Sequence, residues 1–439
     1  MSRAYDLDRA HVFHSWSAQA ALQPMVIDRA EGSYVWDDEG RRYLDLASQL
    51  VYTNLGHQHP VVVAAIQKQA ATLCTVAPQH ANLARGEAAR LITELTPPGL
   101  DKVFFTNGGA DANEHAVRMA RLHTGRPKVL AAYRSYHGGT QTAINLTGDP
   151  RRWPNDSASQ GVVHFFSPFL YRSAFHATTE EEECERALQH LEQVIAFEGP
   201  ATIAALVMET IPGTAGVLVP PAGYLAGARD LCDRYGIVWI ADEVMCGFGR
   251  TGEWFAFDHD DVAPDLITFA KGVSSGYTPL GGVLVGKRVK APFWDDPIPG
   301  AVFRHGYTYS GHSATAAGAM ANLDIIEREG LVERVKRLEP VLARAVGRLA
   351  DAPLVGEIRT VGLTAAVALK PEVLVADPGA VDKVIAAALR HGVASRVLRG
   401  HAVHISPPFV ISESQIDAMV DGIGNALEDV AGVAAAVGA

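Results

Sequence analysis

The sequence predicts an α/β fold with two parts: a large domain built on a mostly parallel sheet covered by helices on both faces, and a smaller α+β domain. Three observations support this. Between residues 100 and 290, short continuous apolar segments alternate with longer amphipathic segments, as in a parallel sheet buried on both faces. Beyond about residue 320 helices dominate and the strands are short. The length of 439 residues suits one large domain plus a smaller one.

The first part of the chain, residues 1–59, is predicted to be an N-terminal segment that packs with the small domain. It contains one clear hairpin, from Tyr34 to Leu44, with Asp38-Glu39-Gly40 in the turn. A helix follows at Pro60–Leu73, where apolar residues recur at helical spacing, and another is expected at Gly86–Leu95.

The large domain is predicted to span residues 60–320, and its core consists of alternating strands and helices. The expected strands are Lys102–Thr106, Val129–Ala132, Ile203–Met208, Ile237–Ala241, Leu266–Ala270 and Gly282–Val285, the last of them as an antiparallel member. The expected helices are Asp111–His123, Thr179–Phe197 and Gly223–Tyr235. Thr179 suits an N-cap, and the glutamates after it favour a helix start.

The small domain is predicted at residues 321–439 and is joined to the large domain through a long alanine-rich helix. That helix is expected at Ser313–Glu329, and a second one follows at Val332–Leu349. Short strands are expected within Ile358–Leu369 and at Val403–Ser406, with helices at Ala380–His391 and Glu413–Val430.

Composition excludes several classes of partner. A net charge of −11 argues against nucleic acid or an anionic membrane, and no apolar segment is long enough to span a bilayer. Met1–Arg9 is polar and acidic, unlike a signal peptide. The four cysteines are scattered without a Cys-x-x-Cys pair, which indicates reduced thiols. We therefore expect a cytoplasmic protein that acts on small molecules.

Two charged residues end two of the predicted strands. Ile237–Ala241 runs into Asp242, and Leu266–Ala270 runs into Lys271. A charge beside a core costs on the order of several kcal/mol unless something compensates it. A lysine held in a tight glycine-rich backbone can have a lowered pKa and act as nucleophile and base, and an aspartate at a strand end can keep a pyridinium nitrogen protonated. We infer pyridoxal phosphate (PLP) as the partner molecule; the alternatives are a lysine that reaches solvent and an aspartate that caps a loop or pairs with an arginine such as Arg250.

Two further segments fit such a cofactor. Asn107-Gly108-Gly109-Ala110 lies between a strand and a helix, where small residues and free N–H groups can cradle a phosphate. A plain strand-to-helix turn would have the same composition. Tyr136, in Tyr136-His137-Gly138-Gly139, follows another strand and could stack on a flat ring, although buried aromatic residues belong more often to the core.

Two other patterns are decoys. Gly247-Phe-Gly249-Arg-Thr-Gly252 matches the glycine spacing of a dinucleotide site, but that spacing has meaning only between a strand and a helix. The segment that follows it is not helical in character, so an NAD-linked oxidoreductase is the weakest alternative. His57 and His59 lack the clustered ligands of a metal site, and no metal is expected.

Taken together, these residues resemble the class III PLP-dependent aminotransferases, which include ω-amino-acid and amine transaminases, taurine–pyruvate enzymes among them. The resemblance covers nearly the whole chain, and its most specific parts are Ile240–Gly252 and Pro264–Gly272. It implies PLP fold type I, with a large domain built on a seven-stranded type of sheet. It also implies a homodimer, or a tetramer, with the active site at the subunit interface.

The same resemblance implies a role for each matched residue. Lys271 would hold PLP as a Schiff base and move protons, and Asp242 would bind its pyridinium nitrogen. The remaining cofactor contacts would come from Tyr136, stacked on the ring, His137, Glu209, Val244 on the opposite face of the ring, Gly109 and Ala110 at the phosphate, and Thr308 at the phosphate of the partner subunit. The family usually has serine where this chain has Ala110, so one hydroxyl contact to the phosphate is lacking.

The resemblance also suggests a substrate site. Arg396 aligns with the arginine that grips carboxylates, with Arg399 as its rival, and a guanidinium suits that task. Trp16, Val51 and Tyr52 are expected to line the substrate mouth. The expected reaction moves an amino group from an ω-amino acid or amine to a keto acid such as pyruvate, in a ping-pong mechanism. An aminomutase, a decarboxylase and a non-catalytic PLP-binding protein are the alternatives.

Overall fold

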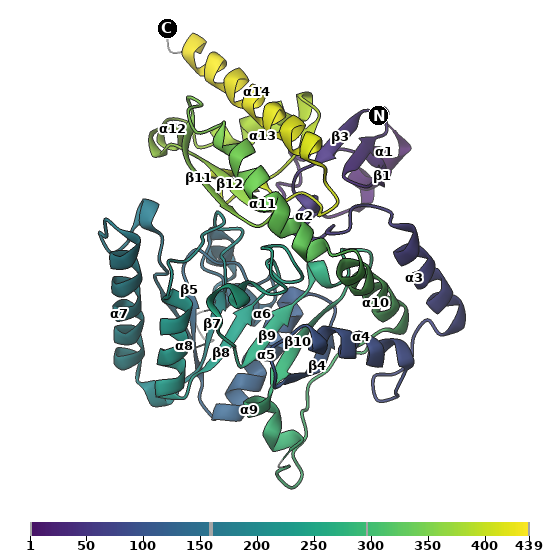
Figure 1. Cartoon of the computed structure of the whole chain (residues 1–439), viewed down its shortest axis with the longest axis vertical. Coiled ribbons are helices and arrows are strands. Elements are labelled where there is room, and N and C mark those ends of the chain that lie inside the picture. Colours follow the sequence, from purple (N-terminus) through teal and green to yellow (C-terminus); the bar gives the residue numbers. More distant parts are fainter. Residues whose placement is uncertain (1, 158–160, 296, 438–439) are drawn as a thin grey trace.

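A seven-stranded sheet forms the centre of the larger part of the molecule, in a computed structural model that describes residues 2–157, 161–295 and 297–437 (Figure 1). In spatial order its strands are β4 (Leu100–Thr106), β10 (Gly281–Gly286), β9 (Leu266–Phe269), β8 (Val238–Asp242), β7 (Ile203–Glu209), β5 (Lys128–Ala132) and β6 (Val162–Phe165). Strand β10 pairs antiparallel with both neighbours, while β9, β8, β7, β5 and β6 pair in parallel. The predicted α/β fold class with a mostly parallel sheet is therefore confirmed.

Strand residues alternate between two apolar cores, one on each face of the sheet. In β5, Val129 packs with one core and Leu130 with the other, and both are fully buried. One face is covered by α5 (Gly109–Thr124), α6 (Gln141–Leu146) and α9 (Lys287–Lys290). The other is covered by α4 (Leu83–Glu94), α7 (Glu180–Glu198), α8 (Tyr224–Tyr235) and α10 (Ser313–Arg328). Burial on both faces explains why these strands are continuously apolar.

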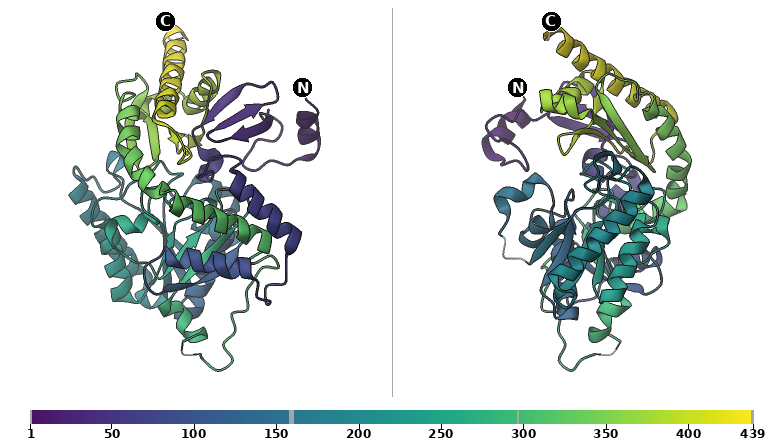
Figure 2. Two further views of the ribbon diagram at one scale, coloured as in Figure 1. Left: turned by 45° about the vertical axis from the view of Figure 1, so that its right-hand side comes forward. Right: turned by 90° about the vertical axis from the view of Figure 1, so that its left-hand side faces the viewer.

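The C-terminal part contains a second, antiparallel sheet of four strands, in the order β11 (Val355–Val361), β12 (Thr364–Leu369), β15 (Ala402–Ile405) and β14 (Val397–Leu398). Its helices are α11 (Leu331–Gly347), α12 (Pro371–Ala376), α13 (Ala380–Arg390) and α14 (Glu413–Val437). Helices α10 and α11 run consecutively from the large sheet to this smaller one (Figure 2).

The N-terminal part contributes α1 (Arg3–His11), β1 (Ile27–Glu31), β2 (Tyr34–Asp37), β3 (Arg42–Asp45), α2 (Ser48–Val51) and α3 (Pro60–Thr72). Strand β3 pairs in parallel with β13 (Val393–Ala394), so the first and last parts of the chain share one sheet. Leu44 and Leu46 pack into the same apolar core as the helices of the C-terminal part. The domain boundaries at residues 59 and 320 stay predictions.

Two local differences from the predicted elements affect the site. Helix α5 begins at Gly109 rather than Asp111, so Gly109 and Ala110 form its first turn. Strand β6 was not predicted, because four residues with mixed burial have no clear periodicity. The predicted cap is present, since the Thr179 side chain accepts a hydrogen bond from the backbone N–H of Glu182.

Candidate active site

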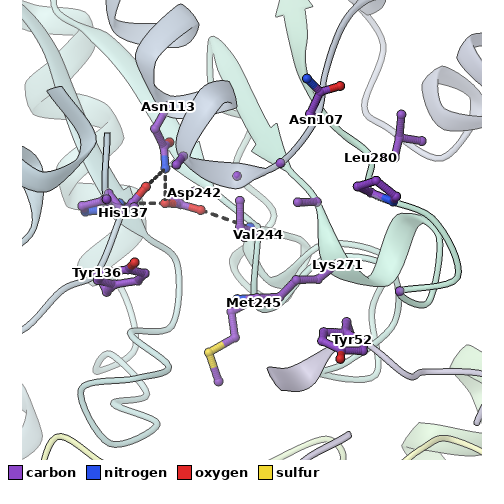
Figure 3. Close-up of a pocket in the computed structure, with 18 of the residues that line it drawn as sticks. Tyr52, Asn107, Asn113, Tyr136, His137, Asp242, Val244, Met245, Lys271 and Leu280 are labelled. Carbon is purple, nitrogen blue, oxygen red and sulfur yellow. Dashed lines mark hydrogen bonds and ion pairs between the residues drawn. The ribbon is translucent and has the colours of Figure 1, made fainter. Parts of the chain in front are cut away.

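A cavity of about 830 Å³ opens at the carboxyl ends of the parallel strands. Asp242 ends β8, and Lys271 follows β9. The two strands are neighbours, as the sequence predicts, and Asp242 pairs with Thr268 across them. Both Asp242 and Lys271 line the cavity, and Lys271 extends across its lower side (Figure 3). This is the crevice in which open α/β sheets bind ligands.

The Asp242 carboxylate is held by three hydrogen bonds (Figure 3). Oδ2 accepts one from Asn113 Nδ2 at 2.8 Å and one from His137 Nδ1 at 2.7 Å, and Oδ1 accepts one from the backbone N–H of Val244 at 3.1 Å. The side chain is 3% exposed. Burial opposes protonation of His137, but the hydrogen bond with Asp242 raises the pKa of the imidazole overall. The site therefore keeps a fixed carboxylate at the end of β8.

The Lys271 amine has no neutralising partner among the described residues. None of them lies within hydrogen-bond or ion-pair distance of its Nζ. Burial, followed by the charge of Arg396, lowers its pKa to about 8. Its backbone is left-handed, with φ +48°, a conformation that is uncommon outside glycine and that often marks functional sites. A lysine with this pKa is partly unprotonated near neutral pH and can act as a nucleophile.

The first turn of α5 forms a tight backbone cradle beside the cavity. A Cβ on Gly109 would lie 2.7 Å from a methyl carbon of Val244. Gly138 has φ +133°, and a Cβ there would lie 2.4 Å from the Cβ of Ala110. The first N–H groups of a helix have no acceptor within the helix, so they can bind an anion such as a phosphate. Gly109, Ala110 and Val244 all line the cavity.

Aromatic residues line the cavity on more than one side, since Tyr136 and Tyr52 lie apart across it (Figure 3). Tyr136 and Trp16 both line it, and their rings meet edge to face with centroids 6.4 Å apart. Tyr52 also lines it, whereas Val51 does not: it is 2% exposed and packs with Ile211, among other apolar residues. Among the expected mouth residues, Trp16 and Tyr52 thus reach the cavity and Val51 supports it from behind.

Glu209 ends β7, next to Asp242 in the sheet. Its carboxylate accepts hydrogen bonds from the backbone N–H groups of Tyr136 at 2.8 Å and Gly213 at 2.9 Å. Burial raises its pKa. Within the described part of the chain no ion pair joins it to Arg396, so here Glu209 orders two loops at the cavity wall.

Arg396 and Arg399 line a second, smaller cavity that adjoins the first. Arg396 Nε donates a hydrogen bond to His404 Nδ1 at 3.1 Å. Thr308 is exposed and does not line the cavity of its own chain. Its expected contact with a partner subunit stays a prediction.

Sequence reasoning missed Asn113 and Thr214, among other residues of the site. Asn113 is 1% exposed in α5, and its Oδ1 accepts a hydrogen bond from Thr268 Oγ1 at 2.9 Å. Thr214 lines both cavities. Asn113 could have been found from the sequence, because it is a polar residue on the apolar face of a predicted helix.

The sequence patterns set aside as misleading have no part in the active site. Arg250 does not pair with Asp242; it is 1% exposed and donates to the carbonyl of Pro407 at 2.6 Å and to Asn54 Oδ1 at 2.7 Å. The described residues contain no cluster of His, Cys, Asp and Glu suited to a metal ion. Over the same residues, no helix has both the length and the apolar character to cross a membrane.

Comparison with known proteins decides the family. The family model for class-III aminotransferases matches residues 16–427. The chain belongs to the class-III aminotransferases. It is 37% identical to the putrescine–pyruvate aminotransferase of Pseudomonas aeruginosa, over 90% of this chain and 88% of that one. It is 36% identical to gamma aminobutyrate transaminase 3, chloroplastic, of Solanum lycopersicum, over 93% of this chain and 81% of that one.

A solved structure extends the similarity to three dimensions. The taurine:2-oxoglutarate aminotransferase of Bifidobacterium kashiwanohense, in complex with PLP and glutamate, superposes with a TM-score of 0.91 and 37% identity, covering 97% of each chain. The fold is thus the PLP fold type I. Class-III aminotransferases depend on PLP, and this chain is an aminotransferase that uses that cofactor.

The residues present fit PLP. The cavity offers the Lys271 amine, which has no hydrogen-bond partner among the residues that the structure describes, a fixed carboxylate at Asp242 and a glycine cradle at the start of α5. These match the aldehyde, the pyridine nitrogen and the phosphate of the cofactor in chemical type. No side-chain hydroxyl stands at Ala110, so the cradle relies on backbone N–H groups there.

Proposed function

We propose that this aminotransferase moves an amino group from an ω-amino acid or amine, such as taurine or β-alanine, to a keto acid such as pyruvate, by a ping-pong mechanism. The observation that carries the proposal is the shared cavity of Lys271 and Asp242, with the Arg396 charge close enough to lower the pKa of the Lys271 amine. An amine-handling centre and a guanidinium beside it suit a substrate with an amine and an acid at separate ends.

The relatives support this substrate class without deciding it. The Pseudomonas protein is named for putrescine and pyruvate, and the Bifidobacterium structure for taurine and 2-oxoglutarate. Those donors share an amine on a primary carbon with a polar group at a distance. The acceptors differ by one carboxylate, so pyruvate and 2-oxoglutarate both need testing here.

Each residue of the site has a proposed task. Bound PLP supplies the electron sink for the carbon that loses its proton. Lys271 would hold the cofactor, and its amine would move the proton as base and then as acid. Asp242, fixed by its three hydrogen bonds, would bind the pyridine nitrogen and favour its protonated form. Tyr136 and Val244 would hold the two faces of the ring.

The remaining contacts of the proposal concern the phosphate and the subunits. Gly109 and Ala110 would donate backbone N–H groups to the phosphate, and His137 and Glu209 would order the walls. Thr308, exposed in the single chain, would reach the phosphate of the partner subunit in a homodimer. A cytoplasmic location stays a prediction.

Two experiments test the proposal. Donors that include taurine, β-alanine, putrescine and an aryl amine are each mixed with pyruvate or 2-oxoglutarate, and alanine or glutamate is measured. We expect product with at least one ω-amino acid or amine; no product with any pair would refute the substrate class. Lys271→Ala should remove both the visible absorption of the bound cofactor and the turnover while circular dichroism stays unchanged. Retained turnover would reject Lys271 as the base.

A third experiment addresses the carboxylate. Asp242→Asn keeps the shape of the side chain but removes its charge, so PLP should still bind while the rate falls by about 100-fold or more, as expected for loss of one electrostatic contact. The absorption spectrum reports binding, and single-turnover rates report the loss. An unchanged rate would remove the electronic role of Asp242.

A further inference from the structure

The loop that carries Lys271 has a strained backbone. Lys271 and Ser275 are both left-handed, with φ +48° and φ +47°, and Gly276 follows with φ +73°. Between them lies one turn of 3-10 helix, η5 (Lys271–Val273). A left-handed backbone is unfavourable for a residue with a side chain, and it persists only where the surroundings hold it. The neighbours of this loop therefore decide where the Lys271 amine lies.

Asn322, in the long helix α10, holds the turn directly after Lys271. Its Nδ2 donates to the backbone carbonyls of Gly272 and Val273, each at 2.9 Å. The orientation of the amide follows from these partners, because a carbonyl oxygen can only accept a hydrogen bond. One side chain thus ties both carbonyls to a helix that lies 50 residues further along the chain than Gly272.

The position of Asn322 is one that favours an apolar residue. The side chain is fully buried inside α10, and asparagine is a weak helix former. Its Oδ1 is buried and has no hydrogen-bond partner among the residues that the structure describes. A buried acceptor without a partner is unfavourable for folding. The favourable contribution of the amide therefore comes from its two bonds to the Lys271 loop.

The N-terminal part of the chain fixes the opposite side of the loop. The Ser275 hydroxyl accepts a hydrogen bond from the backbone N–H of Leu55 at 3.2 Å. A Cβ on Gly272 would lie 2.7 Å from Asn54 Nδ2, so the turn has no room to move toward that segment. Loss of the Asn322 bonds would consequently release the turn on the side of α10.

We propose that Asn322 is a positioning residue for Lys271: by holding the two carbonyls that follow the lysine, it keeps the amine buried and directed into the active-site cavity. Asn322 does not itself line that cavity, so it acts through the loop and not on the cofactor or the substrate. This inference rests on the role proposed for Lys271 and does not depend on which amino donor the enzyme uses.

The pKa of the Lys271 amine reports its position, because burial is the main cause that lowers this pKa to about 8. The other titratable or charged groups that surround the amine are Arg396, Asp242, Glu209, Cys246 and His404. Asn322 carries no charge, and its substitution leaves all of those side chains in place. If the loop is released, water reaches the amine and its pKa should rise toward 10.5.

The test compares PLP with pyridoxamine phosphate as probes of the apoenzyme. Pyridoxamine phosphate has an amine in place of the aldehyde, so it can make the same ring and phosphate contacts but cannot react with the Lys271 amine. Stopped-flow absorption follows the capture of PLP across neutral and alkaline pH, and calorimetry measures the binding of pyridoxamine phosphate.

Two variants and one control are needed. Asn322→Leu keeps the size of the side chain and removes both donors. Asn322→Ser keeps one hydroxyl proton, which can serve at most one of the two carbonyls. Ile325→Val is the matched control, because Ile325 is fully buried in the same helix and packs into the core of the C-terminal part.

For Asn322→Leu we expect PLP capture at neutral pH to slow by about 10-fold or more, since each unit of pKa increase lowers the unprotonated fraction of the amine about tenfold. The inflection of the pH profile should move upward from about 8, and Asn322→Ser should give an intermediate loss. Binding of pyridoxamine phosphate should change less than about 2-fold in both variants, as expected for sites without shared contacts. Ile325→Val should leave both probes unchanged. Equal losses for PLP and pyridoxamine phosphate, or wild-type capture by both Asn322 variants, would overturn the proposal.

Lys271→Ala separates this inference from the role of Lys271 itself. That variant should bind pyridoxamine phosphate but lose the absorption band that PLP capture produces; a wild-type band would refute the role proposed for Lys271. Loss of the band in Lys271→Ala, together with unchanged capture by Asn322→Leu, would refute the positioning role alone. Circular dichroism and urea unfolding show that each variant is folded.

Discussion

Asn113→Ala should destabilise the protein more than the loss of so small a side chain suggests, because the Asn113 amide joins three elements of the site. Nδ2 of Asn113 donates to the carbonyl of His137 at 2.8 Å and to Asp242 Oδ2 at 2.8 Å, and Oδ1 accepts from Thr268 at 2.9 Å. The residue is 1% exposed, so water does not replace these bonds.

The magnitude follows from the type of each bond. The bond to a carboxylate is worth about 1.5–3 kcal/mol, and the two neutral bonds about 1 kcal/mol each. The loss of unfolding free energy should therefore be about 3–5 kcal/mol. Thr268→Val removes only one of the three bonds and keeps the shape, so it should cost about 1 kcal/mol. Asn155→Ala, at an exposed asparagine, should cost less than about 0.5 kcal/mol.

Urea unfolding of the apoenzymes at one protein concentration measures these differences. Trp239 is a suitable fluorescent probe, because it is fully buried in β8, three residues before Asp242. Asn113→Ala should also weaken PLP binding, since Asp242 loses one of its three hydrogen bonds. A loss for Asn113→Ala no larger than that for Thr268→Val would show that the amide does not join the network.

Three other predictions follow from the buried groups. The Lys271 amine of the apoenzyme should titrate at about 8, so the rate of PLP capture should rise through that pH; an inflection near 10.5 would contradict this. Burial raises the pKa of Glu243 from 4.5 to about 7; the stability it contributes is present below about pH 4.5 and is lost as pH rises through 7, by about 3 kcal/mol. Glu243→Gln should therefore flatten the pH dependence of the urea midpoint, and an unchanged profile would argue against a titrating Glu243. Gly138→Ala should abolish PLP retention because its Cβ would lie 2.4 Å from that of Ala110, whereas Gly139→Ala, with no atom within 4 Å, should bind PLP normally; equal binding by both would contradict the close packing.

The decisive residues of the site come from strand ends, which explains why sequence reasoning found them. Asp242 and Lys271 interrupt continuous apolar segments, and the parallel pairing of β8 with β9 places both at one edge of the sheet. Local pattern therefore sufficed, since the carboxyl ends of neighbouring parallel strands share one crevice. The turn at Gly109 was found in the same way, although the helix begins there rather than two residues later.

What the local pattern could not supply are the contacts between segments distant in the sequence. Asn113 meets Asp242 across 129 residues and Thr268 across 155. Val51 was expected at the substrate mouth but lies behind it in the core. Arg151, which lies over the Tyr136 ring, carries no signal of its own, because a basic residue in a polar loop is usually a solvated one.

The sequence alone determined the α/β class, most of the strands and helices, and the pair Asp242 and Lys271, because periodicity and strand ends are local properties of the chain. The resemblance of its motifs to the class III aminotransferases indicated the cofactor. The tertiary structure alone decided which side chains surround that pair. It fixed Asp242 through Asn113 and His137, and it brought Arg151 over the ring of Tyr136. These contacts depend on how separate segments pack, and packing of that kind leaves no periodic trace in the sequence.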